Sequence, residues 1–370
     1  MLDLAIALEK LLAAARLPSL TEDLPLARAL GRVLAEDVIA SLDVPGFDNS
    51  AMDGYALHVA DFQALPPSFA ISGRIAAGET GAALAPGEAA RIFTGAPIPS
   101  GANAVVMQEV CTTESGLLTV DGPVKPGMNI RLRGEDIASG RTVLAAGSRL
   151  TPQALGLAAS IGVATLKVHV PLKVALLSTG NELTEPGQPL APGKIYNSNR
   201  YVLLGLLQTL GCEETDCGII PDDFAATVEA LSQAAAGHDV VITSGGVSVG
   251  TADLVKDVIA ELGRIEFWRL AVKPGKPVTF GRIQDCLVLG LPGNPVSVMV
   301  SFLMFARPLL LKLMGVRPVD AARLRVRADF QFRRKPGRRE WLRARLRFDS
   351  DQALLASIYH TNSSGALSSL

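Results

Sequence analysis

Apolar and polar positions in the second half of the chain predict an α/β sheet. From Lys173 onward, short apolar runs such as "KVALLS" and "DVVITS" alternate with amphipathic segments of helical length such as "DDFAATVEALSQAA". This alternation is typical of a parallel sheet with helices on both faces. The segment "RIEFWRLAVKPGKPVTFGRI" has strand-like residues on either side of a Pro-Gly turn, and it predicts an added hairpin.

The first half of the chain has a different pattern. Residues 45–136 are rich in Gly and Pro and contain short apolar pieces such as "SFAISGRI" and "ANAVVMQEV", which predicts a β-rich domain. Helical patterns flank it at residues 3–15 and 152–161, and the second begins with a Thr151 cap followed by Pro152. The β-rich part is therefore predicted to be an insertion in a helical region.

Together these patterns predict a multidomain α/β protein. At 370 residues the chain is too long for one ordinary core. In order of first appearance, the expected parts are a discontinuous helical linker domain, an inserted β-rich domain, an α/β domain built on a parallel sheet, and a C-terminal β domain. The linker domain covers residues 1–44 and 137–170, and the inserted domain covers 45–136. The α/β domain covers 171–315, and the C-terminal domain covers 316–370.

Charge and cysteine content narrow the function classes. The chain has 35 Lys and Arg against 36 Asp and Glu, a balance that favours neither nucleic acid nor an acidic membrane surface as a partner. In "RLRVR" and "RARLR" arginine stands at every second residue, and we favour a solvated strand face over a polyanion-binding surface. The four cysteines show neither CxxC pairing nor the density of a disulfide scaffold, so reduced thiols are expected.

No segment has the pattern of a signal peptide or a membrane span. The opening "MLDLAIALEKLLAAARL" carries charges within its apolar pattern and predicts an amphipathic helix. The longest apolar run, residues 296–306, stops at Arg307, short of the roughly 20 residues that span a bilayer. We expect a soluble, cytoplasmic protein.

Polar loops follow the predicted strands, and in an open parallel sheet such loops meet at one edge. They read "STGNEL", "PDD", "SGGVSVGTAD" and "LPGNP", with "KPGK" in the hairpin. They would gather the carboxylates of Glu182, Asp222 and Asp253 with the amines of Lys273 and Lys276. Such a set suits a phosphorylated ligand whose charge is shared by lysines, backbone N–H groups and a divalent cation.

Each of these loop residues also has a structural alternative. The acids could cap helices and the lysines could be solvated hairpin charges, but convergence of five loops favours a site. In "LPGNPVSV", Asn294 and Pro295 have N-cap and first-turn roles, so the helix from Val296 is expected to present free N–H groups. The glycine turn of "TSGGVSVGTAD" is expected to do the same. The motifs GxxxxGK[ST] and GxGxxG are absent, so common nucleotide fingerprints are not predicted. No serine is expected to form a nucleophile elbow, so hydrolase-type nucleophilic catalysis is not predicted either.

Seven segments, in this order, resemble the signatures of the molybdopterin molybdenumtransferase family, which includes bacterial MoeA and the E-domain of gephyrin. They lie between residues 45 and 300 and read "FDNSAMDGYAL", "RIFTGAPIPSGANAVVMQE", "NIRLRGEDI", "STGNEL", "TSGGVSVGTAD", "VKPGKP" and "LPGNPVSV". The resemblance implies that the α/β domain binds molybdopterin. It also implies insertion of molybdate into adenylated molybdopterin, with release of AMP and use of Mg²⁺ or another divalent cation.

The family motifs also imply roles for individual residues of this chain. The residues with implied catalytic roles are Asp53, Thr94, Asp136, Glu182, Asp222 and Asp253, of which the last three would also hold the metal ion. The residues with implied cofactor-binding roles are Ser244, Gly245, Gly246, Ser248, Arg269, Lys273, Lys276, Pro292, Gly293, Asn294 and Pro295.

The resemblance further implies a homodimer whose active site joins the sheet domain of one subunit to the inserted domain of the other. Its expected protein partners are the molybdopterin adenylyltransferase and molybdoenzyme apoproteins, with no nucleic acid and no membrane. Two departures stand out. Arg269 stands where some members have lysine, and members usually continue for some tens of residues beyond "SSGALSSL". The C-terminal β domain is therefore expected to be incomplete, which leaves the role of Ser364 open.

Two alternatives remain beside the insertion reaction. The molybdopterin adenylyltransferase shares the sheet-domain type, but it lacks an inserted domain with "NSAMDGYAL". A non-catalytic carrier or scaffold that binds the finished cofactor is the other alternative. The presence of Asp53, Glu182, Asp222 and Asp253 disfavours a pure scaffold.

Overall fold

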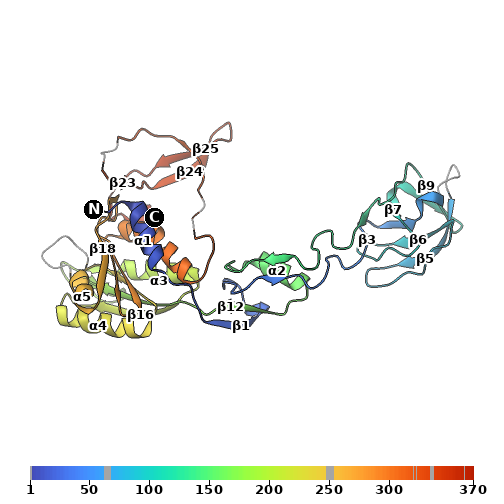
Figure 1. The fold of residues 1–370 in the computed structure, drawn as a ribbon. Helices are drawn as coiled ribbons and strands as arrows, with labels where there is room; N and C mark the ends of the chain where they lie inside the picture. Colours follow the sequence, from blue (N-terminus) through green and yellow to red (C-terminus); the bar gives the residue numbers. More distant parts are fainter. Residues whose placement is uncertain are drawn as a thin grey trace. The chain divides into compact units, whose positions relative to one another are not determined.

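The computed structural model describes residues 2–61, 68–246, 254–319, 321, 323–333, 337–361 and 363–370. The chain forms two compact units, whose elements are labelled in Figure 1. The first unit comprises Met1–Glu36, Gly147–Thr151 and Leu166–Leu370, and the second comprises Asp37–Ala146 and Pro152–Thr165.

A six-stranded sheet forms the centre of the first unit. Its strands lie in the order β16, β13, β17, β21, β20 and β18. Their bounds are Glu213–Ile220, Lys173–Thr179, Val240–Ser244, Cys286–Leu291, Thr279–Ile283 and Arg264–Trp268. The first four strands are parallel to one another, whereas β20 and β18 extend the sheet in antiparallel fashion. The predicted parallel sheet and the predicted hairpin are both confirmed.

Helices cover both faces of this sheet, as the sequence predicted (Figure 1). One core contains residues of α1 (Leu4–Ala14) and α3 (Ser198–Leu210) packed with Leu176 of β13. The opposite core contains residues of α4 (Phe224–Gly237) and α5 (Leu254–Leu262) packed with Ala175. Successive residues of a strand point to opposite faces, so the apolar run of β13 contributes to both cores.

One helix of the described chain, Pro295–Leu313, is long and apolar enough to cross a membrane by length and composition alone. It consists of α6 (Pro295–Ser301), a π-helical turn η4 (Phe302–Ala306) and α7 (Arg307–Leu313). About 56% of its most apolar window is buried inside the protein, so packing against the sheet accounts for its composition. The apolar run 296–306 ends at Arg307, and the helix continues past it because α7 adds Leu309, Leu310 and Leu311 to the same core.

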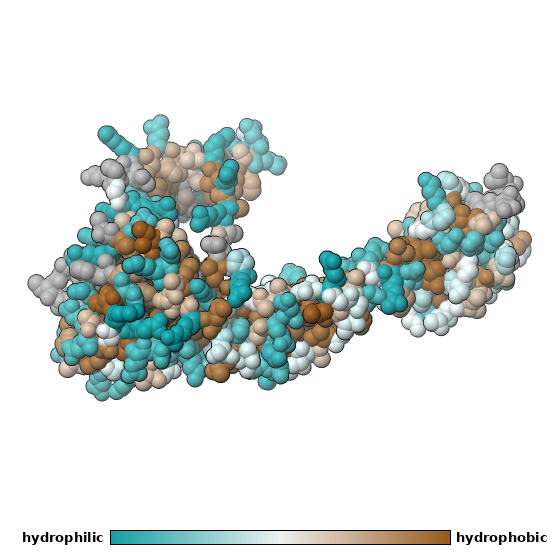
Figure 2. Space-filling view, in the orientation of Figure 1, coloured by the Kyte–Doolittle hydropathy of each residue, from teal (hydrophilic) through white to brown (hydrophobic). Residues whose placement is uncertain are grey.

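The C-terminal segment forms a small sheet of β22 (Arg327–Ala328), β25 (Leu354–Ile358) and β24 (Ala344–Phe348). All five residues of β24 are exposed, and hydrophilic side chains project from this region in Figure 2. Arg327 pairs with Asp349 and Arg347 pairs with Asp329. These surface ion pairs agree with the solvated strand face that we favoured. A further strand, β23 (Arg339–Glu340), pairs with β19 (Val272–Lys273) of the hairpin connection.

The second unit is built on another six-stranded sheet, in the order β7, β4, β6, β5, β9 and β8. The bounds of these strands are Ala104–Met107, Gly54–Leu57, Glu88–Ile92, Ser68–Ile75, Leu117–Val120 and Cys111–Glu114. Apolar residues pack on both faces, around Phe69 and Leu118 on one face and around Ile75 and Ile92 on the other. The predicted β-rich character of this region is confirmed.

Short strands accompany the predicted helices in the segments that flank the β-rich domain in the sequence. The helix predicted after Thr151 is present as α2 (Pro152–Ser160). The flanking segments, which we expected to be helical, also form strand pairs that are too short to show a period in the sequence. These pairs are β1 (Thr21–Pro25) with β12 (Thr165–His169) and β2 (Val38–Ile39) with β11 (Thr142–Leu144). Two more short pairs lie outside those segments, β3 (Asn49–Ser50) with β10 (Ile130–Arg131) and β14 (Leu183–Thr184) with β15 (Ile195–Tyr196). Short 3₁₀ turns occur at Leu26–Arg28, Val59–Asp61, Gln108–Val110 and Leu367–Ser369.

Candidate functional site

The carboxyl ends of the four parallel strands meet at one edge of the first sheet. The ladder pairs Thr179 with Ile220, and it pairs Ser244 with both Ser178 and Leu291. The loops after β13, β16, β17 and β21 therefore begin side by side. These are the four strand-end loops that the sequence predicted to converge, and this edge is where open parallel sheets bind ligands.

Glu182 and Asp222 lie in two neighbouring loops of this edge. The Asn181 N–H donates to Asp222 Oδ2 at 2.9 Å, and the Asp222 N–H donates to Asn181 Oδ1 at 3.1 Å. Glu182 follows directly, and its carboxylate lies so close to Gly180 that a Cβ atom there would be 2.5 Å from Glu182 Oε2. Asp223, not Asp222, caps α4 by accepting a first-turn N–H at 2.9 Å. The alternative in which Asp222 caps a helix is therefore wrong.

The two carboxylates have the chemistry of a Mg²⁺ site. Mg²⁺ prefers oxygen ligands and commonly needs one or two protein carboxylates beside waters and substrate phosphates. Both residues are exposed and available to a ligand. Among the residues that the structure describes, no three His, Cys, Asp or Glu side chains gather into a metal site. The expected third ligand, Asp253, and the expected cofactor residue Ser248 lie outside the described residues.

The turn after β17 packs tightly against the end of β13. Gly245 and Gly246 have φ values of 93° and 67°, and a Cβ atom on Gly245 would lie 2.3 Å from the carbonyl oxygen of Thr179. The left-handed backbone and the close approach both require glycine. However, the Gly245 N–H donates to the Leu291 carbonyl at 3.2 Å. This N–H is therefore used within the protein, and residues 247–253 of the turn lie outside the described residues.

Asn199, near the start of α3, joins two of these loops. Its Nδ2 donates to the Gly293 carbonyl at 2.6 Å and to Ser244 Oγ at 3.2 Å. The sequence pattern does not single out Asn199, which stands in a polar cluster, "NSNR", at the beginning of a helix. Asn199 fixes the turn after β21 relative to the turn after β17.

A pocket of about 240 Å³ lies beside the turn after β21. Its positively charged lining residues are Lys273 and Lys276, which the sequence predicted, and Arg338 and Arg343, which it did not. The remaining described lining residues are Val272, Pro274, Gly275, Pro277, Asn294, Ser297, Glu340, Trp341 and Ser364. Four cations and one carboxylate around a small cavity make it electropositive.

Contacts across this pocket join the sheet to the C-terminal segment. Asn294 Nδ2 donates to Ser364 Oγ at 3.1 Å, and the Val296 N–H donates to the Ser364 carbonyl at 3.0 Å. Asn294 is the N-cap residue of α6, as predicted, with Pro295 at the first position. The expectation of a free N–H at Val296 is wrong, because Ser364 accepts it. Ser364, whose role the sequence left open, therefore lies at this pocket.

Two ion-pair and hydrogen-bond arrangements fix the charged residues of the pocket. Lys273 Nζ lies 2.6 Å from Glu340 Oε1, and the Glu340 side chain is only 10% exposed. Arg343 Nη2 donates to the carbonyls of Thr361 and Ser363 at 2.6 and 3.1 Å, which holds the chain that leads into Ser364.

Two other predicted residues contribute differently. Arg269 has a φ of 65° and its carbonyl accepts the Leu2 N–H at 3.1 Å, but it is not among the described lining residues of the pocket. Pro292 follows β21 directly and leads into the turn that Asn199 holds.

In the second unit, Asp53 and Thr94 form a hydrogen-bonded pair. Asp53 precedes β4 and Thr94 follows β6, and these strands are antiparallel, so the two residues meet at one end of the sheet. Asp53 Oδ1 accepts both the backbone N–H and the hydroxyl of Thr94 at 2.8 Å. The Thr94 N–H, its hydroxyl and the charge of Arg91 lower the pKa of Asp53 below its ordinary value. Asp136 is exposed, and its N–H donates to the Val44 carbonyl at 3.0 Å.

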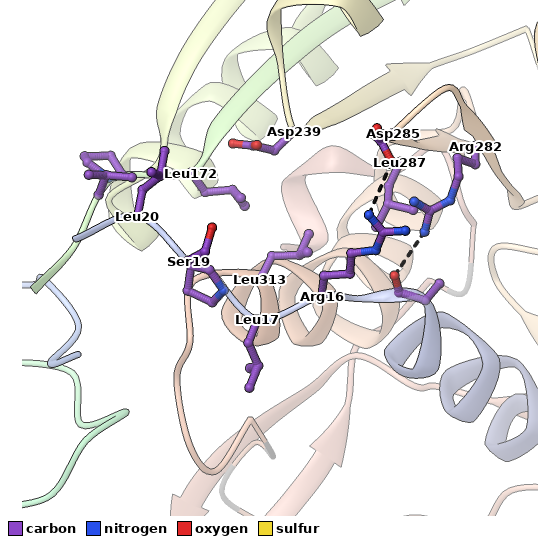
Figure 3. Close-up of a pocket in the computed structure, with 14 residues that line it drawn as sticks. Arg16, Leu17, Ser19, Leu20, Leu172, Asp239, Arg282, Asp285, Leu287 and Leu313 are labelled. Carbon is purple, nitrogen blue, oxygen red and sulfur yellow. Dashed lines mark hydrogen bonds and ion pairs between the residues drawn. The ribbon is translucent and has the colours of Figure 1, made fainter. Parts of the chain in front are cut away.

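A second pocket, of about 280 Å³, lies at the opposite edge of the first sheet (Figure 3). Leu172 and Asp239 precede β13 and β17, so this pocket is at the amino ends of the strands. Arg16 pairs with Asp285 at 3.3 Å and Arg282 donates to the Ala14 carbonyl at 3.1 Å, as the dashed lines in Figure 3 show. Its charges are balanced, and none of the predicted site residues lines it.

The fold defines a class of protein, namely a multidomain α/β protein whose parallel strands gather polar loops at one edge of the first sheet. Residues 2–162 match the family described as the MoeA N-terminal region, domains I and II. Residues 175–312 match the probable molybdopterin binding domain. Both matched segments contain acids that the sequence analysis singled out.

Similar proteins agree with these domain matches. The molybdopterin molybdenumtransferase of Haemophilus influenzae is 46% identical over 317 residues, which cover 85% of this chain and 78% of that protein. Molybdopterin molybdenumtransferase 2 of Mycobacterium tuberculosis is 41% identical over 303 residues, which cover 79% and 75%. The crystal structure of the molybdopterin biosynthesis MoeA protein from Pyrococcus horikoshii matches all of this chain and 92% of that one, with a TM-score of 0.85 and 32% identity. The chain belongs to the molybdopterin molybdenumtransferase (MoeA) family, and it is a transferase of molybdenum cofactor biosynthesis.

Proposed function

We propose that this protein transfers molybdenum from molybdate into adenylated molybdopterin at the carboxyl edge of the first sheet, yielding molybdenum cofactor and AMP. The observation that carries this proposal is a continuous chain of contacts along that edge. Asp222 contacts Asn181, Gly245 contacts Leu291, Asn199 contacts Gly293, and Asn294 contacts Ser364 at the electropositive pocket. Carboxylates suited to a cation and a pocket suited to an oxyanion thus lie in loops of one edge of the sheet.

The electropositive pocket is the proposed site for molybdate. Molybdate is a tetrahedral dianion, and Lys273, Lys276 and Arg343 offer positive charge around a cavity of about 240 Å³. The Ser364 hydroxyl, which already accepts from Asn294, has a proton left to donate. These residues would bind and orient molybdate while the pterin phosphates occupy the neighbouring glycine and proline turns.

Glu182 and Asp222 are proposed to hold Mg²⁺ or another divalent cation, with Asp253 as a third ligand. Such a cation would neutralise negative charge on the phosphates of the adenylated pterin. The protein's part is to fix Asp222 through its two hydrogen bonds with Asn181, the residue before Glu182. Asp53, Thr94 and Asp136 of the β-rich domain are proposed to complete the catalytic set.

The proposed reaction is tested with purified protein, adenylated molybdopterin, molybdate and Mg²⁺, by measuring AMP release. Transfer of the product to a molybdoenzyme apoprotein reports cofactor formation. We expect AMP and active molybdoenzyme to appear together and to require all three additions. A related molybdenumtransferase serves as the positive control. The proposal is refuted if that control is active while this protein releases no more AMP than a protein-free sample. Release of AMP without molybdate would indicate hydrolysis instead of insertion.

The proposed cation site has a matched pair of variants in adjacent residues. Asp222→Asn removes a carboxylate that faces the edge, whereas Asp223→Asn replaces one helix cap by another good cap. We expect Asp222→Asn to weaken Mn²⁺ binding, measured by calorimetry, about 10-fold or more, and Asp223→Asn to leave it unchanged. Equal affinities in the two variants would exclude Asp222 as a ligand.

We also propose that the protein is a cytoplasmic homodimer whose active site includes residues of both subunits, as the family resemblance implies. Asp53→Ala and Asp253→Ala would then damage different halves of every site. After random subunit exchange about half of the dimers are mixed, each with one intact site, so activity should reach about a quarter of wild type. No recovery despite demonstrated exchange would refute the shared site. The molybdopterin adenylyltransferase and molybdoenzyme apoproteins remain the proposed partners before and after this step.

A further inference from the structure

Arg91 of β6 is held between two aromatic rings beside Asp53. In the antiparallel ladder it lies directly opposite Tyr55 of β4. Its guanidinium carbon is 5.2 Å from the centre of the Tyr55 ring and 4.9 Å from the centre of the Phe93 ring. Cation–π contacts on two rings restrict a side chain that would otherwise be flexible. The guanidinium therefore has a defined place next to the start of β4.

From this position Arg91 contacts the two segments of the polypeptide that hold Asp53, at Gly54 and at Gln108. Its Nη1 donates to the Gly54 carbonyl at 3.1 Å, and its Nη2 donates to the side-chain oxygen of Gln108. The Gln108 N–H in turn donates to the Asp53 carbonyl at 3.1 Å. Arginine can make these two contacts together because its donors form a planar fork.

The carboxylate of Asp53 has one oxygen that is held by hydrogen bonds and one that is open to solvent. Oδ1 accepts two hydrogen bonds from Thr94, and the residue is exposed, so Oδ2 is accessible to a ligand. A shift of the Asp53 backbone would lengthen both bonds to Thr94, because Thr94 belongs to a different strand connection.

We propose that Arg91 is a positioning residue: by clamping the Gly54 peptide and the Gln108 side chain, it holds Asp53 against Thr94 in the geometry that the reaction requires. This inference rests on the proposed role of Asp53 and Thr94 in molybdenum insertion. It assigns to Arg91 no contact with the substrate.

Arg74 provides a matched control on the neighbouring strand. It is the ladder partner of Arg91 in β5, and its guanidinium also lies over the Phe93 ring, at 4.7 Å. Within the described chain, however, Arg74 makes no hydrogen bond to Gly54 or Gln108. Removal of Arg74 changes the local charge and the aromatic stack while leaving the clamp in place.

The test compares Arg91→Met, Arg91→Lys and Arg74→Met in the full-length protein. Three quantities are measured: the pKa of the Asp53 carboxyl by NMR, hydrogen exchange at the Gln108 amide, and the rate of molybdenum insertion. We expect Arg91→Met to raise the Asp53 pKa, to accelerate exchange at Gln108 about 10-fold, and to slow insertion about 100-fold, the order of loss expected for a misplaced catalytic group. Arg91→Lys keeps the charge but not the fork and should remain slow, whereas Arg74→Met should stay within about 2-fold of wild type.

Equal effects of Arg91→Met and Arg74→Met on the Asp53 pKa and the Gln108 amide would overturn the inference, as would full recovery of insertion in Arg91→Lys. If wild type itself shows no insertion, the proposed function fails. The NMR and exchange measurements then still decide whether Arg91 positions Asp53.

Discussion

Gly54→Ala should loosen the β-rich domain at the strand that carries Asp53. A Cβ atom at this position would lie 1.8 Å from the carbonyl oxygen of Val106 in the neighbouring strand β7. An ordinary contact begins near 3.4 Å, so β4 and β7 must separate by about 1.6 Å. Overpacking of this kind costs about 1–3 kcal/mol, and a lost ladder hydrogen bond costs about 1 kcal/mol more. We therefore expect a loss of about 3 kcal/mol in the local free energy of unfolding.

Hydrogen exchange measured by mass spectrometry on peptides from β4, β6 and β7 checks this magnitude. A loss of about 3 kcal/mol corresponds to about 100-fold faster exchange of the ladder amides. Gly73→Ala is the matched control, because Gly73 lies in β5 of the same sheet and a Cβ atom there would meet nothing within 4 Å. We expect that variant to be unchanged or up to about 1 kcal/mol more stable. Unchanged exchange in Gly54→Ala, or equal changes in both variants, would refute the steric argument.

Three further predictions concern charge and burial. Lys273→Ala should weaken molybdate binding, and the difference from wild type should shrink as salt is raised because the lost interaction is electrostatic; equal binding at low salt would contradict this. Hydrogen bonds from the Ser139 N–H and then from Arg133 lower the pKa of Asp43 below its ordinary 3.8, so the folded state keeps this charge where the unfolded chain takes up a proton. Its stabilising contribution is present above about pH 4 and is lost as pH falls further, so urea unfolding of Asp43→Asn should depend less on pH between about 5 and 3 than that of wild type. Burial raises the pKa of the Cys212 and Cys286 thiols to about 12, so iodoacetamide at pH 8 should label them more slowly than Cys217, which is more exposed; equal labelling rates in the folded protein would contradict their burial.

The parallel sheet could be predicted because each of its strands and helices is recognisable from a short, continuous stretch of sequence. Each strand is a short apolar run, and each helix repeats its apolar positions within a few turns, so the order of elements follows from the chain itself. Convergence of Glu182 and Asp222 followed from topology, since parallel strands place their following loops together. Short pairs such as Val38–Ile39 with Thr142–Leu144 have no such signal, because two or three residues show no period and the partner is about a hundred positions away.

At the pocket beside α6, too, contacts between residues far apart in the sequence could not be predicted. Lys273 and Lys276 were predicted from a Pro-Gly turn, but Arg343 and Ser364 are brought there by pairing of the C-terminal segment with the hairpin connection. Nothing in "RARLR" distinguishes Arg343, which contacts the carbonyls before Ser364, from Arg345, which lies over the Tyr359 ring at 5.4 Å. The distinction is made by tertiary contacts.

The use of backbone donors changes how an anion would be held at this edge. The sequence favoured N–H groups of the glycine turn and of the helix at Val296, which are fixed dipoles and act through short-range hydrogen bonds. Gly245 and Val296 each donate instead to a carbonyl of the protein, at 3.2 and 3.0 Å. Positive charge at the pocket comes from the side chains of Lys273, Lys276, Arg338 and Arg343, of which Lys273 is already paired with Glu340. An oxyanion must compete with Glu340 for Lys273, so binding at this edge should respond to ionic strength more strongly than binding to a helix terminus would.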